Sequence, residues 1–271
     1  TTFQGAPMST ASDAADPSAP RRPQVQKINA DDVYAALRAG WEDFRATSRF
    51  GLFFGGVYAA VGILLFLLLW LLEQPLWIVP FAFAFPLIGP FAAIGLYEVS
   101  RRRETGAPLT WSDVLGVVWN ERNRQIPSMA FIVLALFLLW MWVASMLVIL
   151  FLGRMSGAVY SNLDALLATG NGIMLLVVGG LVGGLIAFLL FALTAVSLPL
   201  LLDRDVDYVT AMTVSLQAVT DNPHAMLHWA WIVVALLFVG MLPMFLGLIV
   251  ALPVLGHATW HIYRKVIAPQ A

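Results

Sequence analysis

The chain has 271 residues, of which 60% are hydrophobic and 11% are charged, and its formal net charge is −1. This composition excludes an ordinary soluble domain, and the balanced charge gives no indication of a nucleic-acid partner. The absence of cysteine excludes disulfides, thiolate metal sites, iron–sulfur clusters and cysteine nucleophiles. The lipid bilayer is therefore the expected environment of the protein.

Residues 1–27 contain prolines among small polar residues, a composition typical of a disordered tail. The membrane domain is expected over residues 28–266, followed by a short C-terminal tail over 267–271. An α-helix crosses the roughly 30 Å hydrocarbon layer with about 20 apolar residues. Six segments approach this length, near residues 51–72, 77–97, 129–152, 171–200, 226–242 and 245–263. We predict an all-α polytopic membrane protein with six transmembrane helices.

A short amphipathic stretch precedes each pair of predicted spans, at residues 31–48, 110–119 and 206–220. Thr110 is the predicted N-cap of the second stretch. The apolar positions at helical spacing are Val33, Leu37, Trp41 and Phe44 in the first stretch, and Tyr208, Met212, Leu216 and Val219 in the third. We predict three cytoplasmic interfacial helices. Either one unit is repeated over residues 31–100, 110–202 and 206–266, or the chain has the interfacial helices that accompany many helical bundles.

The basic residues lie almost entirely on one side of the predicted spans. Every Lys and Arg except Arg154 falls before the first span, between the second and third, after the fourth, or after the sixth. Because cytoplasmic loops carry the excess of Lys and Arg, we predict that both termini are cytoplasmic. A bacterial inner membrane fits this pattern best.

Glycines at close spacing mark two of the predicted spans. The positions are Gly51 and Gly55 in the first span, and Gly179, Gly180, Gly183 and Gly184 in the fourth. Small residues allow helix backbones to approach closely. These glycines indicate either packing within the bundle or contact with a partner protein.

Two stretches of the sequence resemble a known family. Residues 85–91, Phe-Pro-Leu-Ile-Gly-Pro-Phe, lead to Tyr97-Glu98 and Ser100-Arg101-Arg102, and residues 198–206, Leu-Pro-Leu-Leu-Leu-Asp-Arg-Asp-Val, lead to Asn222-Pro223. Together they resemble a bacterial family of predicted integral membrane proteins, a domain of unknown function, over most of residues 28–266. The resemblance implies six helices. Some members carry labels that connect them with cytochrome c oxidase, which implies an association with respiratory-chain proteins. The labels do not imply catalysis here, because this chain lacks the dense intramembrane histidines of a catalytic oxidase subunit.

The two motifs also have a physical interpretation. Tyr97 and Glu98, followed by Arg101, Arg102 and Arg103, suit a membrane anchor at the cytoplasmic interface. Alternatively, the arginines bind anionic lipid headgroups.

Acidic residues surround one arginine just after the predicted fourth span, at Asp203, Arg204 and Asp205. We expect this group to form a structural network by pairing with Arg45, Arg49 or the run 101–103. Cation binding by the carboxylates is the alternative.

All four histidines fall at one predicted membrane face. His224 and His228 begin the fifth span, and His257 and His261 end the sixth. Each pair has i,i+4 spacing and shares a helix face, so the four imidazoles are candidate ligands for zinc, copper or haem iron. Interfacial histidines beside tryptophans are the alternative.

The remaining catalytic signals are missing. The sequence has no nucleophile elbow, phosphate-binding loop or His-Glu-x-x-His zinc signature. Asp, Glu, Lys and Arg are also absent from the middle of every predicted span, where ion-coupled transporters need them. We expect a non-enzymatic protein without a cofactor. It would be an accessory or assembly subunit that contacts other integral membrane subunits of an inner-membrane complex. The resemblance suggests that this complex belongs to the respiratory chain. A transporter or channel for a small or lipidic substrate is the alternative, indicated by the prolines of the second span.

Overall fold

The structure is a computed structural model that describes residues 23–72, 93–121, 125–153 and 167–269. Within these ranges the regular elements are α-helices, and an isolated antiparallel bridge joins Val25 to Ile267. The all-α prediction is confirmed. The helices in chain order are α1 (Ala30–Ala46), α2 (Ser48–Leu72), the 93–105 helix, α4 (Trp111–Glu121), α5 (Ile126–Leu152), α8 (Gly170–Thr194), α9 (Ser197–Asp203), α10 (Tyr208–Asp221), α11 (Pro223–Met241) and α12 (Leu248–Val266).

Four apolar stretches in these ranges are long enough to cross a membrane: Ser48–Leu68, Ile126–Leu152, Gly170–Asp203 and Pro223–Met241. They correspond to the predicted first, third, fourth and fifth spans. The predicted second span, 77–97, lies mostly outside the described residues. α12 covers most of the predicted sixth span, but it is not among the four, because its polar and basic residues lower its hydropathy. A protein with several membrane spans is supported, whereas the count of six is not.

Helices occupy all three of the predicted amphipathic stretches, as α1, α4 and α10. The Oγ1 atom of Thr110 accepts a hydrogen bond from the Asp113 N–H at 3.2 Å, so Thr110 caps α4 as predicted. The buried face of α10 differs from the prediction. Leu216 is exposed, whereas Ala211 and Ala218 are fully buried. Small residues allow α10 to approach α8 and α9 closely, and the spacing of large residues does not reveal this face.

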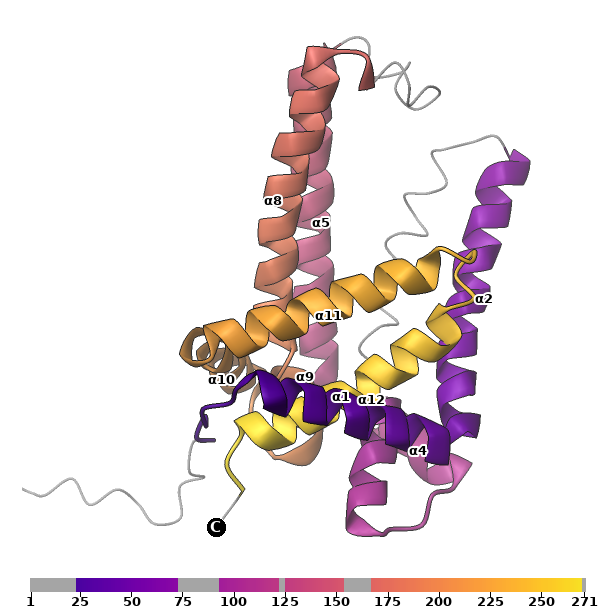
Figure 1. Ribbon diagram of the computed structural model, residues 1–271, viewed down its shortest axis with the longest axis vertical. Coiled ribbons are helices and arrows are strands. Elements are labelled where there is room, and N and C mark those ends of the chain that lie inside the picture. The colour runs from indigo at the N-terminus through magenta and orange to yellow at the C-terminus, as the bar shows by residue number, and fades with distance from the viewer. Residues whose placement is uncertain (1–22, 73–92, 122–124, 154–166, 270–271) are drawn as a thin grey trace, which may run out of the picture.

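α12 packs along both α1 and α2 at the foot of the molecule (Figure 1). A Cβ atom on Gly40 would lie 2.6 Å from the backbone nitrogen of Ala258, and one on Gly55 would lie 2.5 Å from the carbonyl oxygen of Ile249. Glycine is therefore required where α1 and α2 touch the backbone of α12. Gly51 lies at the same contact, against Pro253.

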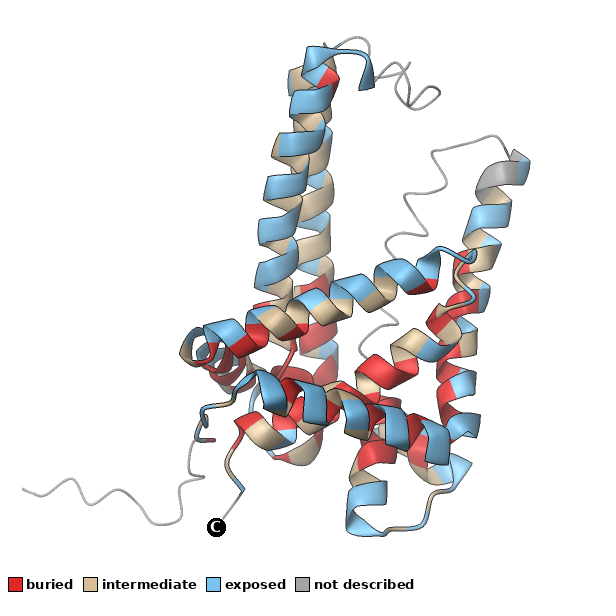
Figure 2. Ribbon diagram, viewed as in Figure 1, coloured by how far each residue is buried: buried red, intermediate tan, exposed pale blue. Residues whose placement is uncertain are grey.

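α5 and α8 form a long hairpin that extends away from the foot (Figure 1). In the most apolar window of each helix only 6% of the residues are buried, and Figure 2 shows exposed residues along its length. An apolar cavity of about 290 Å³ lies between the two helices. Gly183 faces Trp140 there, whereas a Cβ on Gly179, Gly180 or Gly184 would have no neighbour within 4 Å.

α11 runs across α5 and α8 rather than along them (Figure 1). It packs against α12, to which a short turn connects it. In that turn Phe245 has a φ of 66°, and its ring lies against Gly62 of α2. The turn is thus held against α2, which fixes the far end of α11.

Candidate functional site

A group of polar side chains is buried where α1, the 93–105 helix and α12 meet. We call it the Asp43 cluster: Asp43 from α1, Ser100 and Arg103 from the 93–105 helix, and His257 and His261 from α12. Asp43 is 4% exposed, Ser100 is 1% exposed and His257 is fully buried. Spacings of three and four residues place the paired side chains on one face of each helix.

The carboxylate of Asp43 is the acceptor that joins the three helices. The Ser100 hydroxyl donates to Oδ2 at 2.7 Å, and Nε2 of His261 lies 2.8 Å from the same oxygen. Arg103 forms an ion pair with Oδ1. A buried carboxylate is costly unless it is paired and hydrogen-bonded, and these contacts provide that compensation.

The proton arrangement of His257 follows from Ser100. The Ser100 oxygen lies 2.8 Å from Nδ1 of His257. Because the single hydroxyl proton is donated to Asp43, the imidazole must carry its proton on Nδ1 and donate it to Ser100. The other ring nitrogen, Nε2, is buried and has no hydrogen-bond partner among the described residues. A neutral His257 suits this environment, because a second N–H would have no acceptor.

The electrostatics agree with this assignment. His257 lies in α12, which is not one of the four candidate spans. Its burial lowers its pKa to about 4. Burial alone would raise the pKa of Asp43, but hydrogen bonds from His261 and Ser100 outweigh this effect and hold that pKa below its usual value. Near neutral pH the cluster therefore combines an ionised Asp43 with a neutral His257.

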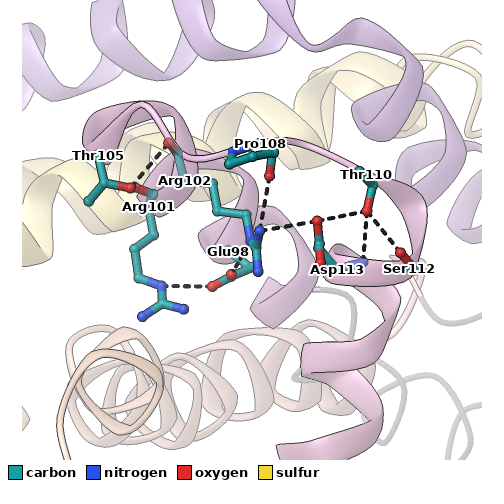
Figure 3. Close-up of polar contacts among 8 residues, drawn as sticks. All are labelled: Glu98, Arg101, Arg102, Thr105, Pro108, Thr110, Ser112 and Asp113. Atoms are coloured by element: carbon teal, nitrogen blue, oxygen red, sulfur yellow. Dashed lines mark hydrogen bonds and ion pairs between the residues drawn. The ribbon is translucent and has the colours of Figure 1, made fainter.

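Glu98 is the second buried carboxylate, and it is completely buried. Figure 3 shows its contacts with Arg101 and Arg102. Nε of Arg101 lies 2.7 Å from one carboxylate oxygen, and Nε of Arg102 lies 2.6 Å from the other. Arg102 also lies 3.2 Å from Asp113 of α4. Arg102, which Glu98 holds from within the same helix, therefore joins the 93–105 helix to α4.

The residues predicted as a lipid anchor lie among these contacts. Tyr97 is 5% exposed, Arg101 and Arg102 both pair with Glu98, and Arg103 pairs with Asp43. The 93–105 helix also packs tightly against a neighbouring helix. A Cβ on Gly95 would lie 2.3 Å from the Phe54 ring, so this helix does not face lipid on that side.

The Asp203–Arg204 group pairs with the C-terminal end of α12. The Tyr263 hydroxyl donates to Asp203 at 2.6 Å, and Arg264 lies 3.8 Å from the same carboxylate. Arg204 donates to the carbonyl of Ala268. These partners differ from the arginines that the sequence suggested, because the C-terminal end of α12, and not α1 or the 93–105 helix, lies beside the end of α9.

The four histidines do not converge. His257 and His261 belong to the Asp43 cluster, whereas His228 places its ring edge-on against Tyr34, with centroids 5.2 Å apart. His224 is exposed. No group of three or more His, Cys, Asp or Glu suited to a metal ion occurs in the described ranges. The spacing correctly pairs His257 with His261, but His224 and His228 have different surroundings and lie apart from that pair.

Sequence reasoning missed Asp43 and Ser100 as members of a site. A signal was available for Asp43, because it lies beside Phe44 on the face of α1 that also carries Val33 and Ala36. A carboxylate on the apolar face of an amphipathic helix requires a polar partner on another element. Ser100 gave no comparable signal.

The fold and these clusters define an all-helical integral membrane protein in which the buried Asp43 joins three helices. Residues 78–203 match the model of a family described as predicted integral membrane protein, DUF2189. The match supports the membrane family that the sequence motifs suggested. No curated protein and no solved structure matches the chain.

Proposed function

We propose that the protein is a non-catalytic accessory or assembly subunit of a larger complex in a bacterial inner membrane, with both termini cytoplasmic. The observation that carries this proposal is the α5–α8 hairpin. Over most of its length each helix has only the other as a neighbour among the described residues, and large apolar side chains such as Trp142 and Leu185 are exposed. A hairpin of this kind offers lateral surface to neighbouring membrane proteins as well as to lipid.

The glycines of α8 give that surface a place for close contact. Gly180 and Gly184 are exposed, are separated by one helical turn, and have no neighbour within 4 Å of an added Cβ. Small residues at this spacing allow a partner helix to approach in a membrane. They contrast with Gly55, which α12 already contacts.

The polar clusters support a non-catalytic role. Ser100 has a histidine and a carboxylate nearby, but it is 1% exposed and its proton is committed to Asp43. A nucleophile needs access to its substrate, and the buried Ser100 hydroxyl does not have it. The cluster instead joins helices.

The alternative, a transporter or channel for a small or lipidic substrate, is less well supported for polar solutes than for lipidic ones. The cavity between α5 and α8 is lined by apolar residues such as Val133, Phe137 and Leu190. Sites for polar or ionic substrates in membranes need convergent polar groups.

The test is purification of the tagged protein from its native membrane in mild detergent, followed by mass spectrometry and a visible absorption spectrum. We expect stoichiometric recovery of other integral membrane subunits. Haem absorbance that follows those subunits would place the complex in the respiratory chain. A single species without a partner would contradict the proposal.

A pair of variants identifies the surface. The double variant Gly180→Leu/Gly184→Leu should lose the partner while its own folding is preserved, because nothing in the described structure occupies that space. Gly56→Leu is the matched control, since an added Cβ there also has no neighbour within 4 Å. Full recovery of the partner with the double variant would exclude this face of α8 as the contact.

A further inference from the structure

The outward face of α1 carries aromatic and basic side chains in one line. Tyr34, Arg38, Trp41 and Arg45 follow one another at steps of four, three and four residues, so they share one face of the helix. All four are exposed, Tyr34 by 52% and Trp41 by 44%. The adjoining face, with Val33 and Phe44, packs into the protein, and the Trp41 ring lies beside that of Phe44, with centroids 5.7 Å apart. We call these four residues the α1 stripe.

We propose that the α1 stripe binds anionic phospholipid headgroups in the leaflet where α2 enters the membrane. This inference does not depend on the accessory-subunit proposal. It concerns a surface on the opposite side of α1 from the Asp43 cluster.

The charges of the stripe are available to a ligand. Arg38 and Arg45 have no ion pair or hydrogen bond with any residue in the described ranges. By contrast, Arg101 and Arg102 pair with Glu98, and Arg103 pairs with Asp43. The arginines that the sequence first suggested for lipid binding are therefore largely neutralised within the protein, and those of α1 are not.

The acids near the stripe pair elsewhere, are buried, or lie along one edge of it. Asp32 pairs with Lys265 at 2.9 Å, and Asp43 is buried on the other face. Asp31 and Glu42 are exposed along one edge of the stripe, and no ion pair joins them to its arginines within the described structure.

The connection to α2 places the stripe at headgroup depth. α1 ends at Ala46, and α2, a candidate span, begins at Ser48. Arg45 is thus less than one helical turn from the start of the span. α1 runs across the foot of α2 in Figure 1, the orientation of a helix that lies in the plane of the interface. Tyrosine and tryptophan are enriched at this depth, and arginine there attracts anionic lipids.

The experiment uses the natural absence of cysteine. Ala35→Cys introduces a single thiol at an exposed position beside the stripe, to which a bimane fluorophore is attached. The full-length protein is reconstituted in phosphatidylcholine vesicles that contain increasing fractions of brominated phosphatidylglycerol, with brominated phosphatidylcholine as the reference. Quenching reports which lipid contacts α1.

We expect phosphatidylglycerol to quench at lower mole fractions than phosphatidylcholine, with a preference of roughly fivefold for each arginine. Arg38→Gln and Arg45→Gln should each reduce the preference, and so should high salt. Arg101→Gln is the charge-matched control, because that arginine pairs with Glu98, and it should leave the preference unchanged. Equal quenching by the two lipids, no quenching by either, or a preference that survives in Arg38→Gln/Arg45→Gln would overturn the proposal.

Discussion

Asp43 joins three parts of the chain that are far apart in sequence. Its carboxylate receives Ser100, His261 and Arg103 while it is almost completely buried. Removing its charge would leave Arg103 without its partner and weaken a buried hydrogen bond from Ser100 and a partly buried one from His261. The exposed neighbour Glu42 has no such contacts and provides an internal comparison.

We predict that Asp43→Asn lowers the free energy of unfolding by about 1–3 kcal/mol, because it weakens the hydrogen bond from the buried Ser100 hydroxyl, whereas the partly exposed Arg103 is compensated by solvent. Glu42→Gln should change it by less than about 0.5 kcal/mol. Unfolding by heat or by SDS in detergent micelles, followed by tryptophan fluorescence, measures both. Equal effects of the two variants would show that the Asp43 cluster does not hold α12 in place.

His257 makes the same cluster sensitive to acid. Its pKa is lowered by burial to about 4, whereas an unfolded histidine has a pKa of about 6.5. Between these values the unfolded chain binds the proton and the folded chain does not, so stability is complete above about pH 6.5 and falls as the pH decreases toward 4. The difference corresponds to roughly 3 kcal/mol. The groups that face His257 are Ser100, Asp43, His261 and Arg103.

The pH dependence of unfolding in micelles tests this expectation with His257→Gln and, as the control, His224→Gln. The slope between pH 6.5 and 4 should decrease in His257→Gln and persist in His224→Gln, because His224 is exposed. A slope that is unchanged in His257→Gln would assign the acid sensitivity to other groups.

Some of these side chains were predictable and others were not. The i,i+4 spacing correctly paired His257 with His261, because neighbours on a helix face are fixed by local geometry. The partners of that face depend on how α12 crosses α1 and the 93–105 helix, which no local pattern encodes. The same limit explains why Glu98 looked like an interfacial residue, although tertiary packing buries it.

Some glycines are required by a close contact between helices, whereas others have free space beside them. We predict that Gly55→Leu disrupts the packing of α2 on α12, because its Cβ would lie 2.5 Å from a backbone oxygen that cannot move aside easily. Gly56→Leu, one residue further, should have little effect on folding. Thermal unfolding of the two variants in the same detergent distinguishes them, and a stable Gly55→Leu protein would argue against the α2–α12 contact.

The helical segments were largely predictable, because long apolar runs and amphipathic stretches have strong local signals. Their arrangement was not. α12 has the length of a span, yet it packs beneath α1 and beside α2, and α11 crosses the α5–α8 hairpin (Figure 1). Hydropathy measures the affinity of a segment for an apolar environment, which protein neighbours supply as well as lipid.

The whole molecule has two contrasting regions. Around α1 and α12, buried carboxylates and glycine contacts hold several helices together, and the bridge between Val25 and Ile267 brings the two ends of the described chain side by side. Among the described residues the α5–α8 hairpin has few neighbours, and it exposes apolar residues along its length. A compact foot that carries an extended apolar hairpin is the architecture expected of a subunit that contacts others within the bilayer.

The most direct test of that account is crosslinking from α8 in native membranes. A photoactivatable group attached to the single cysteine of Gly184→Cys reports what lies against the hairpin, and Ala192→Cys, at a buried position of the same helix, provides the comparison. The account predicts a protein adduct of defined mass from position 184 that is absent from position 192. Labelling of lipid alone from position 184 would contradict a subunit role for the hairpin.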